Sequence, residues 1–230
     1  MIRTVRKNNR LSTKLNLKTR IRQTLIRFSL NLDSDLISQD NYNLTICDKP
    51  KFIWFRVAKV CTRSIFDHLK NSGLDLDAEQ AMCVHYSPAM YSEYFKFAFV
   101  RNPWSRLVSC WKNKVVESNY FKFSSNELAK MQQFENFVKY VATLDIERCD
   151  HHLRLQSKLI DLNNVDFVGR FENFEQDFKH VQEVLKMEPM SIPHLNRSGA
   201  NNQVYYTDDL KGRVAEIYKK DINLFSYKFE

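Results

Sequence analysis

Glycine is scarce in this chain: four occur among 230 residues, and none lies before residue 73. The glycine-rich phosphate loop G-x-x-x-x-G-K-[ST] and the dinucleotide fingerprint G-x-G-x-x-G are therefore both absent. A P-loop-like nucleotide kinase or another nucleotide-binding protein remains an alternative interpretation, but the chain lacks the motif that defines that class.

Clustered cysteines and long apolar runs are missing as well. Five cysteines are spread through the chain without a C-x-x-C pair, and cysteines so far apart do not indicate a metal site. No segment approaches the ~20 apolar residues of a membrane span. We therefore expect reduced thiols, no metal and a cytoplasmic location, with at most peripheral membrane contact.

Acidic residues are absent from one end of the chain. There are 35 Lys and Arg against 27 Asp and Glu, a net charge of +8, but residues 1–32 hold nine of the basic residues and no acid. We expect 1–32 to be a basic amphipathic leader or arm, either a transit peptide, a lipid-contacting helix or an arm packed on the domain. Residues 33–230, which are close to neutral, should form a single domain. That neutrality disfavours the non-enzyme alternative, a basic-arm nucleic-acid-binding protein, so we expect no nucleic-acid partner.

Apolar runs and helical periodicity alternate along the body of the chain. Strands are predicted over 51–57, 95–100 and 165–168. Helices are predicted from about 65 to Gly73, and over 103–116, 134–144, 174–185 and 207–218, with Asn173 and Gln176 spaced like a capping box. Residues 187–202 should be a loop. Strands alternating with helices predict a three-layer α/β fold with a mainly parallel central sheet flanked by helices.

Groups that suit anions follow two of these strands. Lys59, Thr62, Arg63 and Ser64 come after the first strand, just before a helix N-terminus, where backbone N–H groups and a lysine can hold a phosphate-like group. Arg101 follows the second strand, and Ser109 lies two turns into the next helix. Since ligands in open α/β sheets sit beyond the carboxyl ends of the strands, the sequence predicts two anion sites at one sheet end.

These motifs carry a family resemblance. FRVAKVCTRSI (55–65) resembles the 5′-phosphosulfate loop of sulfotransferases that use 3′-phosphoadenosine 5′-phosphosulfate (PAPS), and FKFAFVRNPWSRLVSCWKNK (95–114) is very similar to their 3′-phosphate motif. The branch is sulfotransferase family 2, with heparan sulfate 2-O- and chondroitin or dermatan sulfotransferases and bacterial relatives. Weaker similarity extends the resemblance over about 51–229, which leaves the leader outside it.

The resemblance implies a P-loop-like sulfotransferase fold and the transfer of a sulfuryl group from PAPS to an acceptor hydroxyl, most simply of a carbohydrate, without a metal. The residues it assigns to the donor are Lys59, Val60, Cys61, Thr62, Arg63 and Ser64 at the phosphosulfate, Arg101 and Ser109 at the 3′-phosphate, and Asn196 and Ser198 in a late segment. Arg63 departs from the small residue common in relatives.

The acceptor hydroxyl needs a general base. His85, in CVHYSP, stands where the glycan 2-O-sulfotransferase branch places its catalytic histidine and is the first candidate, and His151 and His152 are its rivals. Arg154 and Gln156 are expected at the acceptor or cofactor. Glu172 is a weaker carboxylate candidate, expected instead to be a structural partner.

Overall fold

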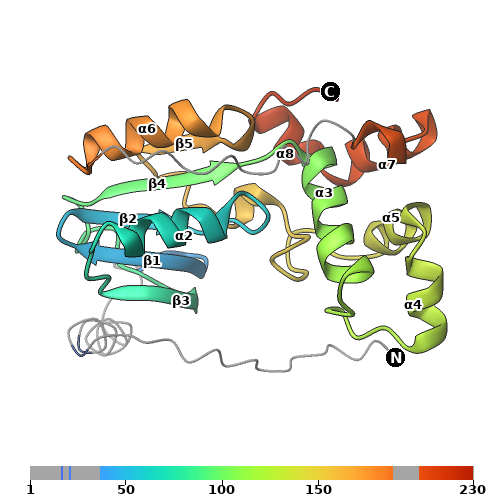
Figure 1. The fold of residues 1–230 in the computed structure, drawn as a ribbon, viewed down its shortest axis with the longest axis horizontal. Helices are drawn as coiled ribbons and strands as arrows, with labels where there is room; N and C mark the ends of the chain where they lie inside the picture. Colours follow the sequence, from blue (N-terminus) through green and yellow to red (C-terminus); the bar gives the residue numbers. More distant parts are fainter. Residues whose placement is uncertain (1–16, 18–20, 22–36, 189–201, 230) are drawn as a thin grey trace.

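The computed structural model describes Leu17, Ile21 and residues 37–188 and 202–229. Its sheet has five strands in the order β3-β1-β2-β4-β5 (Figure 1). The strands are β1 (Tyr42–Asp48), β2 (Lys51–Phe55), β3 (Ala78–Val84), β4 (Phe95–Val100) and β5 (Phe167–Arg170). The predicted leader lies outside the described residues, apart from Leu17 and Ile21, which are both exposed.

The sheet is mixed, so the expectation of a mainly parallel sheet is not confirmed. β2 pairs with β4 and β4 with β5 in parallel, but β1 pairs antiparallel with both β2 and β3. The physical reason is the short connection between β1 and β2: Asp48 faces Lys51 across the turn Lys49–Pro50, which forces a hairpin. β1 and β3 were not predicted from the sequence, whereas the bounds of β2, β4 and β5 lie within two residues of the predicted ones.

The described residues form a helix at each of the five predicted positions, and further helices and helical turns that were not predicted. Together these are α2 (Thr62–Asn71), α3 (Pro103–Trp111), the π-helix η2 (Lys112–Val116), α4 (Ser125–Met131), α5 (Phe134–Ala142), η3 (Gln156–Lys158), η4 (Phe171–Asn173), α6 (Phe174–Val184), η5 (Gln203–Tyr205), α7 (Asp208–Ile217) and α8 (Lys219–Leu224). The segment predicted as one helix over 103–116 is α3 continued by the π-helix.

Helix caps explain several of these boundaries. The Asn102 side chain accepts a hydrogen bond from Trp104 N (3.1 Å) at the start of α3, and the Thr207 hydroxyl caps α7 by accepting from Leu210 N. The predicted capping box at Asn173 is wrong, because its amide donates to the Asp177 carboxylate instead. The observed capping box joins Ser124 and Glu127 on α4, a helix without buried residues and hence without an apolar pattern.

Aromatic side chains hold the layers together. On one face of the sheet, Trp54 of β2 stacks on Phe97 of β4 and contacts Phe66 of α2, and Phe99 contacts Phe178 of α6. Helices α2 and α6 therefore cover this face. On the opposite face, the ring of Tyr86, in the segment after β3, packs on Phe55. Fully buried aromatic rings of this kind supply much of the free energy of folding.

The remaining helices gather beyond one end of the sheet. Figure 1 shows the carboxyl end of β4 pointing toward α3, and α5 and α7 pack on α3 and on each other there. This end, where β2 and β4 finish side by side, is the place at which the two predicted anion sites follow their strands.

We predict that Gly169→Ala destabilises the protein by about 1–3 kcal/mol, because the added methyl would lie 2.5 Å from Cε1 of the buried Phe99 ring. Gly212→Ala is the matched control: nothing lies within 4 Å of the new Cβ in α7, and replacing a helical glycine by alanine should add about 0.5–1 kcal/mol. Urea unfolding of both variants measures the difference. Equal stabilities would contradict the close packing of β5 on Phe99.

Candidate active site

The loop between β2 and α2 is strained and open to an anion. Lys59 and Cys61 adopt left-handed backbone conformations, with φ of 72° and 63°, which in residues other than glycine cost on the order of 1–2 kcal/mol each. Helix α2 follows without a capping side chain or an acid in its first turn. Its N-terminal N–H groups and the positive end of its dipole are therefore available to an anionic ligand.

Lys59 is the cation of this loop. Its Nζ donates to Oδ1 of Asn113 (3.2 Å) on the π-helix η2. Burial above all, together with the nearby charges of Lys114, Arg101 and Arg63, lowers the pKa of Lys59 to about 8. Several cations thus converge at this loop, an arrangement that favours the binding of an anion.

Arg101 joins the second predicted anion site to the first. Its Nη1 donates to the Lys59 carbonyl (3.3 Å) and its Nε to Oγ of Ser105 (2.8 Å), while the ring of Phe171 stacks against the guanidinium. The side chain is buried, which lowers its pKa to about 10, and Nη2 has no hydrogen-bond partner. Ser109 lies one turn beyond Ser105 on the same face of α3. Its hydroxyl therefore lies on the side of α3 that Arg101 contacts.

The other loop residues assigned to the donor differ in what they can offer. The Val60 side chain is fully buried and leaves only its backbone to a ligand. Thr62 donates its hydroxyl to the Val57 carbonyl (3.0 Å), which closes the loop at the start of α2. Arg63 is exposed and Ser64 half-buried. Asn196 and Ser198 lie outside the described residues.

Arg106 was not predicted from the sequence, yet it ties the site together. Its guanidinium is 2% exposed and donates to three carbonyl oxygens, those of Ala58 (3.1 Å), His151 (3.1 Å) and Arg154 (2.9 Å). Ala58 belongs to the loop between β2 and α2, where the donor is expected and which we call the donor loop. His151 and Arg154 belong to the segment before η3, which holds both histidines and which we call the histidine segment. One buried side chain therefore fixes the histidine segment against the donor loop.

The side-chain amide of Gln156 holds the backbone of Arg101 in place. Its amide accepts from Arg101 N (2.9 Å) and donates to Arg101 O (2.8 Å), and the side chain is fully buried, with Asp221 holding its backbone. The structure therefore does not leave Gln156 free for the substrate contact expected of it. Arg154 is likewise engaged within its own segment, where it donates to the carbonyls of Cys149 and Arg148.

Glu172 has the structural role expected of it. One carboxylate oxygen accepts from Asn102 N (2.7 Å) and the other from the Tyr227 hydroxyl (3.2 Å). It therefore anchors the chain just after β4 to the C-terminal segment.

The three candidate bases occupy two places. His85 follows β3 at the sheet edge, is exposed, and has Nδ1 2.8 Å from the Ser38 carbonyl oxygen. Since β1 lies between β3 and β2, His85 stands about 10 Å to one side of β2, two strand spacings. His151 and His152 lie beside Arg106, and Nδ1 of His152 is 2.8 Å from Oδ1 of Asp150.

Burial keeps both adjacent histidines neutral. It lowers the pKa of His151 to about 4 and also lowers that of His152, against the attraction of Asp150. Asp150, His151 and His152 are the one group of three possible metal ligands in the parts of the chain that the structure describes, with their ligand atoms within 4.8 Å. The hydrogen bond between Asp150 and His152 already uses two of those atoms, so we assign these side chains to each other.

Sequence comparisons identify the family to which the chain belongs. Residues 42–228 fit the model of the sulfotransferase family. The chain belongs to the sulfotransferase family. This membership confirms the expected family and enzyme class.

Curated relatives are carbohydrate sulfotransferases. The chain is 26% identical to carbohydrate sulfotransferase 10 of Xenopus laevis, over 86% of this chain and 68% of that protein. It is 27% identical to human carbohydrate sulfotransferase 14 (73% of this chain, 49% of that protein) and 31% identical to mouse carbohydrate sulfotransferase 8 (63% and 42%). The match thus spans about half the length of the last two. No solved structure matches the chain significantly.

The predicted cytoplasmic location of this sulfotransferase is wrong. It conflicts with the family, whose animal carbohydrate sulfotransferases are Golgi membrane enzymes. Among the residues that the structure describes, no helix has the length and apolar character needed to cross a bilayer.

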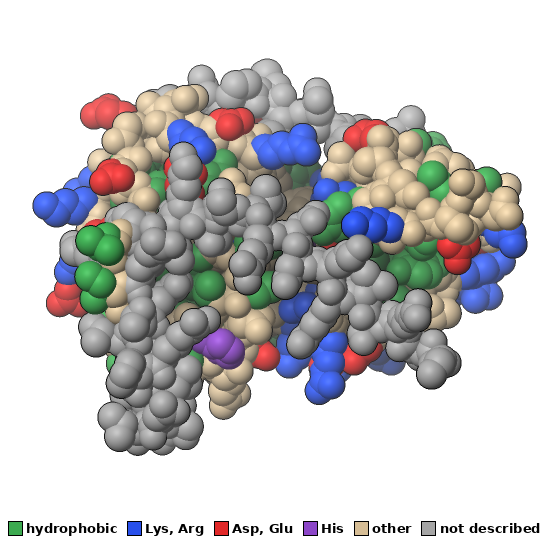
Figure 2. Space-filling model, turned by 90° about the horizontal axis from the view of Figure 1, so that it is seen from below, with side chains coloured by type: hydrophobic (Ala, Val, Ile, Leu, Met, Phe, Trp, Pro, Cys, Tyr) green, Lys and Arg blue, Asp and Glu red, His purple; other side chains and the backbone are tan. Residues whose placement is uncertain are grey.

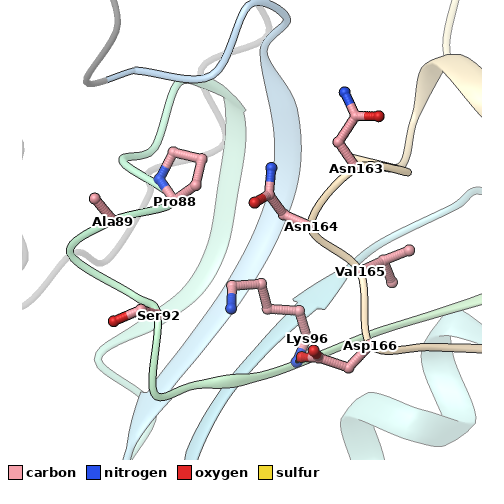
Figure 3. A pocket seen from close by; sticks show the side chains of 8 residues that line it. All are labelled: Pro88, Ala89, Ser92, Lys96, Asn163, Asn164, Val165 and Asp166. Carbon is pink, nitrogen blue, oxygen red and sulfur yellow. The ribbon is translucent and has the colours of Figure 1, made fainter.

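A separate pocket lies at the opposite end of the sheet. Figure 3 shows Lys96 at the start of β4, with Asp166 before β5 and Pro88, Ser92 and Asn164 around them. The Lys96 amine donates to the Tyr94 carbonyl (3.0 Å). Because Lys59 and Arg101 follow the carboxyl ends of the strands, this pocket is not part of the sulfotransferase site.

We predict that Arg106→Ala lowers the free energy of unfolding by roughly 2–4 kcal/mol, because three buried carbonyl oxygens lose their donor. Arg213→Ala is the matched control. Its side chain is 50% exposed and paired only with Asp209, so the change should stay within about 0.5 kcal/mol. Urea unfolding measures both, and an Arg106 variant as stable as the control would show that the three bonds are dispensable.

Proposed function

We propose that this sulfotransferase moves a sulfuryl group from PAPS to a hydroxyl group of a carbohydrate. The observation that carries the proposal is the convergence of Lys59 and Arg101, with a buried, unpartnered Nη2 on Arg101. A PAPS molecule has two separate anionic ends, and the site offers two linked cationic positions. The resemblance of the two motifs and the names of the relatives supply the donor and the acceptor class.

The residues present fit such a donor. Lys59, the N–H groups at the start of α2 and the Ser64 hydroxyl would hold the 5′-phosphosulfate, and Arg101 with Ser109 would hold the 3′-phosphate. The Thr62 hydroxyl would join the first group by exchanging its bond to the Val57 carbonyl for one to the ligand. The bound donor supplies an activated sulfur atom. The protein then positions both substrates and neutralises the charge that develops on the leaving oxygen, which falls to Lys59.

The acceptor hydroxyl gives up a proton as its oxygen bonds to sulfur. We propose that a histidine accepts that proton as the general base. His85, His151 and His152 are the described candidates. No step in this scheme requires a metal ion.

Other functions have weaker support. A nucleotide kinase would bind ATP-like ligands, which lack the 3′-phosphate for Arg101. A nucleic-acid-binding protein would need a basic face. Where Figure 2 draws described side chains, Lys and Arg are interspersed with Asp and Glu instead.

Donor binding is the first test. We predict that adenosine 3′,5′-bisphosphate raises the melting temperature while ATP and 5′-AMP do so less at equal concentration. Arg101→Ala should weaken bisphosphate binding tenfold or more, because a charge-assisted bond to a phosphate is worth about 1.5–3 kcal/mol. Arg148→Ala, which removes an arginine whose side chain is 88% exposed, is the control for general charge loss. Stabilisation by ATP alone would favour the kinase.

The lowered pKa of Lys59 gives a pH test. Without a bound ligand, Lys59 is charged below pH 8 and increasingly neutral above it. We therefore predict that bisphosphate affinity falls between pH 8 and 9, with a limiting slope of about tenfold per pH unit. Lys59→Arg keeps its charge over this range and should flatten the profile. Calorimetric titration at each pH measures this, and identical profiles in both proteins would contradict the role of Lys59.

A further inference from the structure

Asp150 and His152 form a hydrogen-bonded pair beside the donor loop. Oδ1 of Asp150 lies 2.8 Å from Nδ1 of His152 and also accepts a bond from the His152 backbone N–H (2.9 Å). Oδ2 accepts from the hydroxyl of Tyr120 (3.2 Å), whose ring packs edge-on against His152. The carboxylate is held from two sides, so it fixes both the orientation and the tautomer of the imidazole.

The other ring nitrogen of His152 is available. Nε2 makes no hydrogen bond within the described protein, and it is not among the buried polar atoms left without a partner. A carboxylate on Nδ1 requires the proton there, so Nε2 carries the lone pair. This is the arrangement of a base that accepts a proton at Nε2.

The pair lies next to the proposed donor site. Arg106 binds the carbonyl of Ala58, directly before Lys59, and the carbonyl of His151, directly before His152, with the same guanidinium. Lys59 and Lys114 are close enough for their charges to lower the pKa of His152. His85, by contrast, follows the edge strand on the far side of β1.

We propose that His152 is the general base of the transfer and that Asp150 is the residue that positions it. The inference rests on the proposed function, because it presupposes the donor at Lys59. It assigns to Asp150 and Tyr120 a role that neither the motifs nor the comparisons give them.

The acceptor oxygen bonds to sulfur while its proton moves to Nε2 of His152, and the bond from sulfur to the bridging oxygen of the donor breaks. The electron pair of that bond leaves with adenosine 3′,5′-bisphosphate, next to Lys59. The imidazolium, paired with Asp150, then releases its proton to solvent.

The charges around His152 set the pH dependence. Asp150 favours the protonated ring, whereas burial and the cations Lys59 and Lys114 disfavour it, and neutral His151 stacks on it with ring centroids 4.1 Å apart. Arg106 and Arg154 face His151 in turn. Removing the carboxylate should therefore move the ascending limb of the pH–rate profile to lower pH. It also removes the hydrogen bond that holds the proton on Nδ1 of His152.

The first experiment measures transfer from radiolabelled PAPS to unsulfated chondroitin, with adenosine 3′,5′-bisphosphate binding in parallel. We expect His152→Gln to reduce kcat by a factor of 100 to 10,000 and to abolish the ascending pH limb. Asp150→Asn should reduce kcat at least tenfold and shift that limb to lower pH. Both should bind bisphosphate as the wild type does. His180→Gln, an exposed histidine on α6, is the matched control and should change nothing.

Several outcomes overturn the inference. His152→Gln retaining wild-type kcat, or His85→Gln removing the pH limb while His152→Gln keeps it, would move the base elsewhere. An Asp150→Asn variant whose limb stays in place would make Asp150 merely structural. A wild-type protein that binds no bisphosphate would refute the proposed function, and the inference with it.

A second measurement needs no acceptor. Long-range proton–nitrogen NMR of the histidines should show His152 as the Nδ1–H tautomer in the wild type. Bisphosphate should raise the pKa of His152 more than that of His180, because a nearby anion stabilises the imidazolium. An Nε2–H tautomer, or a His152 titration that bisphosphate leaves unchanged, would overturn the proposal even if chondroitin is no acceptor.

Discussion

The three hydrogen bonds of the Arg106 guanidinium are the interaction on which the candidate site depends. A buried cation is costly unless its donors are used, and here three carbonyl oxygens, rather than a carboxylate, receive them. Those carbonyls belong to two segments without regular structure of their own. The distance between the donor loop and the histidine segment is therefore set by one rigid, planar group on α3, a function that a flexible lysine could not perform.

The donor loop explains how a chain poor in glycine can present a phosphate-type loop. Such loops need left-handed backbone positions, which glycine usually supplies. Here Lys59 and Cys61 occupy them. The backbone is strained at both residues, but the loop thereby carries the Lys59 side chain at the anion site. The loop is then held from outside, by Arg106 on Ala58, by Arg101 on the Lys59 carbonyl and by Thr62 on Val57.

The sequence predicts the parts of this site that are local. A buried strand followed by small and cationic residues and then a helix is a pattern over about fifteen residues, so Lys59 and Arg101 were found. β1 escaped because polar Asn43 and Thr45 interrupt its apolar pattern, although both side chains are buried and bonded across the sheet. Arg106 and Gln156 act through partners some fifty residues away, and no spacing in the sequence carries that information.

Burial of the cations links the stability of the site to its affinity for an anion. Burial lowers the pKa of both Lys59 and Arg101. Holding these two charges away from water therefore reduces the stability of the folded protein. A dianionic ligand would raise those pKa values again and recover that energy as binding affinity. The site needs only a few cations, because hydrogen bonds hold Lys59 and Arg101 at fixed positions. The body of the chain can therefore remain nearly neutral. Selectivity for an anion with two separated charges then follows from geometry, since bulk positive charge would attract any polyanion.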